Sequence, residues 1–501
     1  MRSIVNASIL ALAFLVVLSG CDVIDRTEPS TAISQGTALS SETAVEGVRA
    51  SMFDRFHTEG MSTFWMLGPA AQADNTFIRG SQNRFRGLNQ NEDRAGVGTG
   101  QYNLFYNTIN EANILVNGIE EGAVSEARAQ RLEAEGLFIR SLVTHHAART
   151  FSYEPDQTPT SGPGQGFTLG VELKTEPTLA VEDAAQTARS PVDSVYIRLE
   201  NDLNRAITLF QNLPSEQRAS DEFVPSEAAA EALRARVNLY QRDWDDAQQA
   251  ATNALDLADQ QFGSSLAEPS EVRSIFNENS GNPEGIFTID TNPIQESAGV
   301  NNSLAAYTSR QWIAQVPTQD LISLYDSTDA RLDGFYGPCF DEIQGANVQQ
   351  QCRNLNDPGF ELQKYNAEQS TPYADDYIHF RVAEMVLIQA EAQLNLNGVG
   401  PAIDRLNDLR EQRNASQLNS GNFDFESAYD EILAERRREL VAEGHRYFDL
   451  KRLGRDIQKA PGTGQNDIPF SGGQISYRVL DDYPQSELSV NTELVQNPGY
   501  N

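Results

Sequence analysis

Residues 225–255 constrain the fold most, because they predict two helices that pack against each other. The stretch PSEAAAEALRARVNLYQRDWDDAQQAATNAL places small residues along one side of its first half. A short break at Arg242–Asp243 follows, and Trp244, Ala247 and Leu255 then recur at helical spacing. Neither helix can bury its apolar stripe alone, so the pair must pack together and against neighbours.

A second helix pair is predicted at residues 376–413, where a Gly-rich turn separates two helical patterns. Both pairs resemble tetratricopeptide units, in which stacked helix pairs share one core. Further helices are expected over residues 101–120, 125–151 and 190–210. Ser125 and Ser190 are the expected N-cap residues of the last two, with Pro191 at the first helical position.

The remaining segments are rich in loop-forming residues. Proline, glycine and threonine dominate residues 152–190, and residues 263–375 and 457–501 show little periodicity. The predicted fold class is therefore mainly α, a scaffold of helix pairs with irregular loops gathered beside it.

The N-terminal residues indicate export. Arg2 precedes an apolar run at residues 9–18 that is too short to span a bilayer, and LSGC ends at Cys21. This pattern resembles the lipobox of bacterial lipoproteins, in which the chain is cut before the cysteine and the thiol is lipidated. The alternative is an ordinary secretory signal with a chance cysteine at that position.

The domain boundaries follow from this interpretation. Residues 1–20 form the signal peptide, and residues 21–40 form a lipidated tether, since they are polar and show no pattern. Residues 41–501 form the folded domain, divided into a helical part at about 41–260 and a loop-rich C-terminal part at about 261–501.

Cys339 and Cys352 are predicted to form a disulfide. They flank the loop CFDEIQGANVQQQC, and two thiols this close in an exported protein favour a bond. Closing so short a loop contributes about 3 kcal/mol in the chain-entropy treatment. A pair of metal ligands is the alternative, although no histidine lies nearby.

The charge balance excludes a polyanion-binding surface. The chain has 71 acidic and 38 basic residues and a net charge of −33, so its field repels nucleic acid. Only Lys174, Lys364, Lys451 and Lys459 are lysines. Scarce lysine with abundant carboxylates favours a salt-adapted protein, in which salt screens the repulsion, over an ordinary acidic exported protein.

Short catalytic signatures are absent from the sequence. It contains no G-x-S-x-G, H-E-x-x-H, G-x-G-x-x-G or P-loop motif. His145 and His146 are adjacent, so on a helix they diverge by about 100° and chelate one metal ion poorly. Acidic loops such as Asp375–Asp376 offer oxygen ligands for Ca²⁺ but lack EF-hand spacing. No cofactor is expected.

Residues 435–455, ERRRELVAEGHRYFDLKRLGR, form a basic island within this acidic chain. As a single helix the stretch places Leu433, Leu440 and Tyr447 on one face. Its acids lie three or four residues from its bases, so we expect local ion pairs and a structural role.

This stretch resembles the C-terminal signature of the SusD/RagB family of outer-membrane lipoproteins, a pattern close to ERRxEL-x-x-EG-x-RW-x-DLxRxG. Tyr447 stands where tryptophan is common. RVAEMVLIQAEA at 381–392, LVQNPGY at 494–500 and GVELKTEPT at 170–178 match other motifs of the family, in the same order. The resemblance therefore spans nearly the whole mature chain.

The resemblance implies a fold and a function. SusD-like proteins are mainly α, with a tetratricopeptide-like superhelix on one side and a loop-rich ligand face on the other. They are not enzymes; they are anchored to the outer membrane, face the cell exterior and form a lid over a SusC-like TonB-dependent β-barrel. They capture oligosaccharides, or peptides in some members, and pass them to that transporter.

Ligand-binding residues are predicted from the chemistry of sugars, whose apolar ring faces stack on aromatic side chains beside hydrogen-bonding groups. Two tryptophans in loop-like stretches are the candidate platforms, and each has polar neighbours in the sequence. The candidates are Trp65, Asp74, Asn75, Arg79, Tyr307, Arg310 and Trp312. A tryptophan that anchors a loop in the core is the alternative for both platforms.

Two other classes of function are compatible with the sequence. A lipid-anchored glycoside hydrolase needs only a pair of carboxylates, which no short motif identifies. A tetratricopeptide adaptor would bind another protein in its groove. The first predicts turnover, and the second predicts a protein partner without a small ligand.

Overall fold

The computed structural model describes residues 39–78, 83–98, 100–180, 184–276, 282–291, 299–309, 314–338, 360–365, 373–460 and 466–500. Within these ranges the chain is mainly helical, as predicted. The predicted signal peptide, Cys21 and the predicted Cys339–Cys352 disulfide lie outside the described residues. In the described part, no helix has the length and apolar character needed to cross a membrane.

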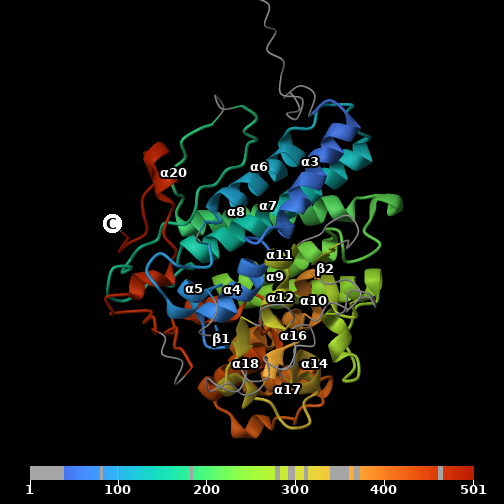
Figure 1. Ribbon diagram of the computed structural model, residues 1–501. Helices are drawn as coiled ribbons and strands as arrows, with labels where there is room; N and C mark the ends of the chain where they lie inside the picture. Colours follow the sequence, from blue (N-terminus) through green and yellow to red (C-terminus); the bar gives the residue numbers. More distant parts are fainter. Residues whose placement is uncertain are drawn as a thin grey trace, which may run out of the picture.

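The long helices form a row in which each helix packs against the next (Figure 1). In order they are α3 (Glu42–Asp54), α6 (Tyr102–Asn117), α7 (Glu126–Phe151), α8 (Val192–Gln211), α9 (Glu227–Gln241), α10 (Trp244–Phe262), α16 (Val382–Asn397) and α17 (Val399–Glu411). α18 (Phe425–Glu439) packs on both α16 and α17. The two predicted pairs, α9–α10 and α16–α17, are neighbours because α10 packs on α16.

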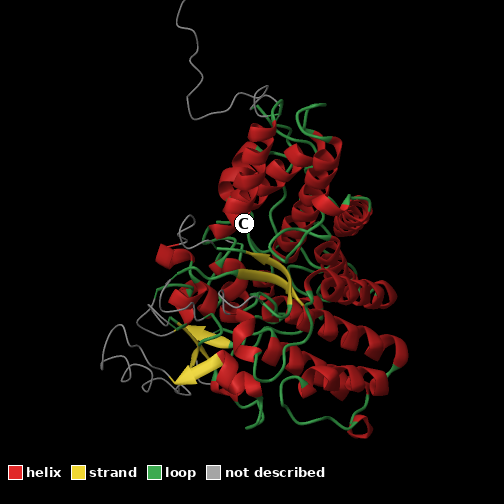
Figure 2. Ribbon diagram, turned by 90° about the vertical axis from the view of Figure 1, so that its right-hand side faces the viewer, coloured by secondary structure: helices red, strands yellow, loops and turns green. Residues whose placement is uncertain are grey.

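Short elements and loops lie beside this row. Figure 2 shows one group of strands at the centre of the molecule, next to the helices, and another at its lower left. Three antiparallel pairs join β1 (Thr76–Ile78) to β3 (Gln315–Pro317), β2 (Gly285–Ile289) to β6 (Tyr377–Arg381), and β4 (Tyr336–Pro338) to β5 (Phe360–Leu362). The β2 and β6 strands contact α9 of the row. The short α-helices are α4 (Thr63–Gln72), α5 (Arg86–Gln90), α11 (Gly299–Asn302), α12 (Leu304–Thr308), α13 (Gln319–Ile322), α14 (Ala330–Phe335), α19 (Arg446–Arg452) and α20 (Gln485–Val490). Short 3₁₀ turns are η1 (Arg55–His57), η3 (Ser215–Gln217), η4 (Val272–Phe276), η5 (Ser420–Asn422) and η6 (Ser476–Val479).

Helix ends follow the local sequence in most places. The Ser125 side chain accepts a hydrogen bond from the Arg128 amide at the start of α7, as predicted. Between α9 and α10, Arg242 adopts a left-handed conformation with φ of 62°, which ends the first helix. The predicted cap of α8 is wrong by one residue, because Pro191 occupies the N-cap and α8 begins at Val192.

Two predicted helices differ from the structure. The helix predicted from residue 376 begins only at Val382, because residues 377–381 form strand β6 against β2. The helix predicted through residues 435–455 is two helices, α18 and α19. Ala442 and Gly444 separate them with φ values of 61° and 81°. A Cβ on Gly444 would lie 2.6 Å from the Trp65 carbonyl oxygen, so α4 requires glycine there.

The basic island lies in the interior rather than on the surface. Its bases are paired, as predicted, but most partners are remote in the sequence rather than one turn away, because the island packs inside the domain. Remote pairs join Arg436 to Asp449, Arg437 to Asp320, Arg446 to Asp74, Lys451 to Glu154, and Arg452 to Glu391. The predicted local pairing holds for Arg438 with Glu435 and for Arg452 with Asp449.

A buried ion network joins α18 to the surrounding elements. The Glu439 carboxylate accepts hydrogen bonds at 2.7–3.0 Å from the guanidinium groups of Arg331, Arg381 and Arg413. Glu284 accepts from Arg381 and Arg413 as well. Burial alone would raise the pKa of Glu439, but the three guanidinium groups lower it well below its usual value. We call these five residues the ion network.

Four of the five histidines are buried in the core: His145, His146, His379 and His445. The His146 ring stacks on Trp65 with centroids 3.6 Å apart, and His379 meets the edge of the same indole at 5.3 Å. Burial lowers the pKa of His379 to about 3, and the nearby charges of Arg236 and Arg149 act in the same direction. These imidazoles are therefore neutral at physiological pH.

Candidate functional site

The β1–β3 pair brings together two loop segments that are far apart in the sequence. Ile78 at the end of β1 lies opposite Gln315 at the start of β3. The predicted ligand residues Arg79, Arg310 and Trp312 directly follow Ile78 or precede this strand in the sequence, and they lie outside the described residues. The register of the two strands thus places the attachment points of both segments side by side.

Described residues beside these attachment points also converge. The Arg84 guanidinium donates a hydrogen bond of 3.1 Å to the Asn301 side-chain oxygen and lies 5.8 Å from the centre of the Tyr307 ring. Phe85 packs on Tyr307 with centroids 4.9 Å apart. The Asn302 amide donates to the His57 carbonyl oxygen at 2.7 Å. We call the surface formed by residues 57–59, 83–86 and 299–302 the loop face.

The chain just before β1 is held in place by α18 and α19. The Arg446 guanidinium makes a two-pronged contact of 2.8 Å with the carboxylate of Asp74, two residues before β1. Arg437 donates to the Asn75 side-chain oxygen at 2.8 Å and to the Asp74 carbonyl oxygen at 2.9 Å. Burial would raise the pKa of Asp74, but Arg446 outweighs it and lowers that pKa to about 2. Asp74 is therefore a fixed anion that positions β1.

The structure reassigns most of the described candidate residues. Trp65 lies in α4 and is 2 % exposed, so its indole is a core residue rather than a platform. Asn75 is fully buried, and Asp74 is tied to Arg446. Tyr307 is 1 % exposed and donates to Glu59 at 2.8 Å, so it supports the loop face from beneath.

The described residues contain no group of three or more His, Cys, Asp or Glu side chains arranged to hold a metal ion. The Asp375 carboxylate accepts hydrogen bonds from Ser303 and the Ala305 amide, and Asp376 accepts one from the Thr291 amide. The pair suggested for Ca²⁺ therefore stabilises loops by hydrogen bonds.

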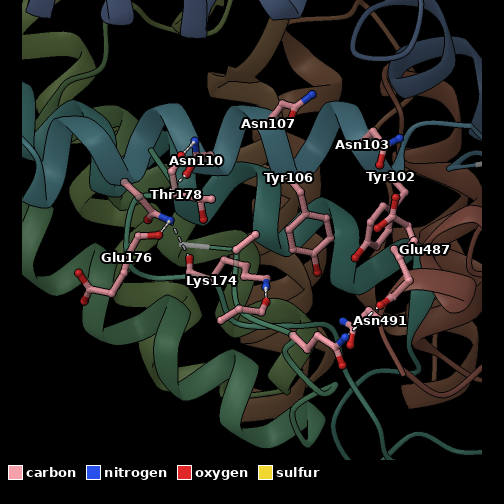
Figure 3. A pocket seen from close by; sticks show the side chains of 15 residues that line it. Tyr102, Asn103, Tyr106, Asn107, Asn110, Lys174, Glu176, Thr178, Glu487 and Asn491 are labelled. Atoms are coloured by element: carbon pink, nitrogen blue, oxygen red, sulfur yellow. Dashed lines mark hydrogen bonds between the residues drawn. The ribbon is translucent and has the colours of Figure 1, made fainter. Parts of the chain in front are cut away.

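A separate cavity of about 560 Å³ opens on the helical side of the molecule. It lies between α6, residues 174–180 and 184–186, and α20 (Figure 3). Sequence reasoning missed this site, because residues 101–120 were interpreted only as a helix. One sequence pattern does point to it. Two tyrosines and several asparagines recur every three or four residues along α6, so they lie on a polar face of the helix.

Comparison with known proteins links two regions of the chain to related profiles. Residues 332–500 match the profile described as the SusD family. Residues 24–239 match one described as starch-binding associating with outer membrane. The SusD-like proteins P38 and P2 of Formosa agariphila are each 24 % identical to this chain over 98 % of its length, and the matches cover 100 % and 98 % of those relatives.

Solved structures show the same fold. A SusD superfamily protein from Bacteroides thetaiotaomicron has a TM-score of 0.76 and 21 % identity, with 91 % of this chain and 100 % of that chain covered. A SusD-like carbohydrate binding protein from Bacteroides vulgatus has a TM-score of 0.73 and 20 % identity, with 91 % and 97 % covered. At this level of identity, the structures support the fold alone.

Proposed function

The chain belongs to the SusD family, and on that premise we propose that it is a non-catalytic, lipid-anchored capture protein of the cell surface. It associates with the outer membrane, binds oligosaccharides at the loop face and delivers them to a SusC-like TonB-dependent transporter. The match to the profile described as starch-binding favours glycans over peptides as ligands.

One observation supports the proposed location of the binding site at the loop face. Arg84 bridges the segment after β1 to Asn301 before β3, so polar groups from two distant parts of the chain meet at one surface. Sugar hydroxyls need such donors and acceptors. The Arg84 guanidinium lies 5.8 Å from the centre of the Tyr307 ring, and Phe85 packs on that ring.

Rigid support is what makes the loop face suitable for capture. Arg437 and Arg446 bind the residues before β1 through buried or partly buried contacts, so little ordering remains to be done when a ligand arrives. Capture followed by release to a transporter requires modest affinity, in the range of about −8 to −4 kcal/mol for micromolar to millimolar binding.

The first test is a gentle detergent pull-down from native membranes in high salt, with the chain tagged at its C-terminus. A large β-barrel transporter recovered at near one-to-one stoichiometry is the expected result. Recovery of this chain alone, or of a soluble assembly in its place, would contradict delivery to a transporter.

The second test locates the ligand by affinity electrophoresis on gels that contain neutral polysaccharides, starch first. Arg84→Ala should raise the dissociation constant for the polysaccharide at least about tenfold, because the charged donor and the packing of its side chain are lost. Arg205→Ala is the matched control, since Arg205 is an exposed arginine on α8 that pairs with Glu133. Equal retardation of both variants would move the site elsewhere. Chromatography of the bound glycan should show no cleavage products.

A further inference from the structure

The cavity on α6 has a fixed aromatic wall. The Tyr102 and Tyr106 rings lie 4.5 Å apart, and Tyr106 is only half-buried, so part of its surface faces the cavity (Figure 3). The buried Glu172 carboxylate accepts hydrogen bonds from the hydroxyls of Tyr102, Tyr106 and Tyr483. Three donors on one carboxylate fix the tyrosines in place, which leaves the Tyr106 ring as a preformed platform.

The opposite walls are also fixed, by side-chain amides. The Asn110 side chain donates to the Thr178 carbonyl oxygen at 3.0 Å and accepts from the Thr178 amide at 2.7 Å. The Asn491 side chain donates to the Thr187 carbonyl oxygen at 3.0 Å, which joins the end of α20 to the same loop. The cavity therefore exists without a ligand, and binding requires little ordering of the chain.

Several polar groups at this cavity are not used by the protein itself. Asn103, Asn107 and Glu487 line the cavity, and their side chains make no hydrogen bond to any described residue. The Lys174 ammonium donates to the Ala185 carbonyl oxygen and the Thr187 hydroxyl, which leaves one of its three protons for a ligand. Donors and acceptors thus surround the Tyr106 ring.

We propose that the cavity formed by Tyr106, Asn103, Asn107, Lys174 and Glu487 is a second binding site for a neutral oligosaccharide, separate from the loop face. This inference rests on the carbohydrate-binding function proposed above. An apolar ring face edged by amides, a carboxylate and an ammonium matches a sugar edged by hydroxyls. Its volume of about 560 Å³ is within the range of small-ligand sites.

The charge of the site selects against anionic sugars. Among the described lining residues, Glu176 and Glu487 face a single cation, Lys174, and the whole chain carries a net charge of −33. A uronate or a sulfate ester would meet repulsion from both carboxylates. Neutral glucans and xylans meet none.

Lys174 provides a direct readout of occupancy. The other three lysines, Lys364, Lys451 and Lys459, are buried, whereas Lys174 is half-buried at the cavity. Burial also lowers the pKa of Lys174, although Glu172 and Glu487 oppose this, so more of its amine is in the reactive neutral form. Brief acetylation of the native protein followed by peptide mass mapping therefore reports access to this cavity.

The experiment compares Lys174 acetylation with and without saturating maltoheptaose, cellohexaose or xylohexaose. At least one of these probes should reduce labelling of Lys174 several-fold in the unchanged chain. Tyr106→Ala should abolish that protection, and so should Asn103→Ala combined with Asn107→Ala. The matched control is Asn201→Ala, which removes an exposed asparagine of α8 outside the cavity. Val490→Trp should also abolish the protection by glycan, because Val490 is exposed at the rim and a larger side chain fills the mouth of the cavity. This variant leaves the walls of the cavity intact.

The outcomes separate the two sites. Protection of Lys174 that survives Arg84→Ala but disappears in the cavity variants establishes the second site. Glycan binding that Arg84→Ala abolishes, with no protection of Lys174 by any probe, overturns the second site and leaves the proposed function standing. A protein that is retarded by no polysaccharide and protected by no probe overturns the proposed function and this inference together.

Discussion

Replacing Glu439 with glutamine tests whether the buried ion network stabilises the fold. Glutamine keeps the size of the side chain but removes the charge that Arg331, Arg381 and Arg413 share. Each guanidinium then faces one carboxylate fewer in the buried interior of the domain. Removing one partner from a buried ion pair costs about 3–5 kcal/mol, because the remaining charge stays desolvated.

That loss is large relative to the whole free energy of unfolding. Domains of this kind are stable by about 5–15 kcal/mol, so a loss of about 3 kcal/mol in Glu439→Gln would remove about a fifth to three fifths of the free energy of unfolding. The remaining carboxylates limit the loss, because Arg331 still pairs with Asp329 and Glu435, and Glu284 still pairs with Arg381 and Arg413. We therefore expect a value near the lower end of the range, about 3 kcal/mol.

The measurement is urea unfolding followed by circular dichroism, with Glu426→Gln as the control. Glu426 lies in the first turn of the same helix but is exposed, so its loss should cost no more than about 1 kcal/mol. A loss below about 1 kcal/mol for Glu439→Gln, equal to that of the control, would refute the reasoning. It would mean that the guanidinium groups find other partners or water once the carboxylate charge is gone.

Three further predictions concern the core and the support of the loop face. The buried histidines stay neutral while the unfolded chain takes up protons below pH about 6.5, so the free energy of unfolding should fall by about 1.4 kcal/mol per histidine at pH 5.5. His379→Phe should therefore reduce the difference in the free energy of unfolding between pH 7.5 and pH 5.5 by about 1.4 kcal/mol. A variant with the same difference as the unchanged chain would contradict this prediction. Asp74→Asn should cost about 2–2.5 kcal/mol near neutral pH, since the lowered pKa of about 2 gives stability above pH about 4 that disappears as the pH falls toward 2; a cost that persists undiminished at pH 2 in urea titrations would contradict the ion pair with Arg446. Trp65→Ala should lower the free energy of unfolding by about 3–5 kcal/mol, as expected for an aromatic core residue; a variant of full stability that loses glycan retardation would restore Trp65 as a ligand platform.

The helical scaffold was predictable because its signals are local. Alanine spacing, the Arg242–Asp243 break and the Ser125 cap lie within a few residues of the structure that they determine. Strand β6 was not predictable, because YIHFR is buried on both faces and continues into α16 without a turn residue. A five-residue segment that is buried on both faces has no periodicity that separates it from a helix.

The candidate site was less predictable, because its determinants are distant in the sequence. Nothing near Asp74 in the chain indicates that Arg446 will bind it, so the prediction of Asp74 as a ligand contact does not follow from its actual partner. Gly68 and Pro69 suggested a loop around Trp65, yet the residues form α4 and the indole stacks on His146. The basic island was correctly predicted to be structural, but its partners become evident only when the elements are assembled.

The ion network also sets the order in which the chain can complete its core. Arg331, Arg381 and Arg413 precede the carboxylate of Glu439 in the sequence, and Arg446 is still later than its partner Asp74. A chain that emerges from a ribosome or a translocation channel with its N-terminus first exposes these arginines before α18 is available. The N-terminal helices can pair early because their contacts are local, whereas the C-terminal half must wait for nearly the whole chain. Truncation before α18 would therefore leave Arg331 with Asp329, and Arg381 and Arg413 with Glu284, after the loss of the Glu439 carboxylate that all three share. An unfinished chain must be kept from aggregating until its last helices arrive.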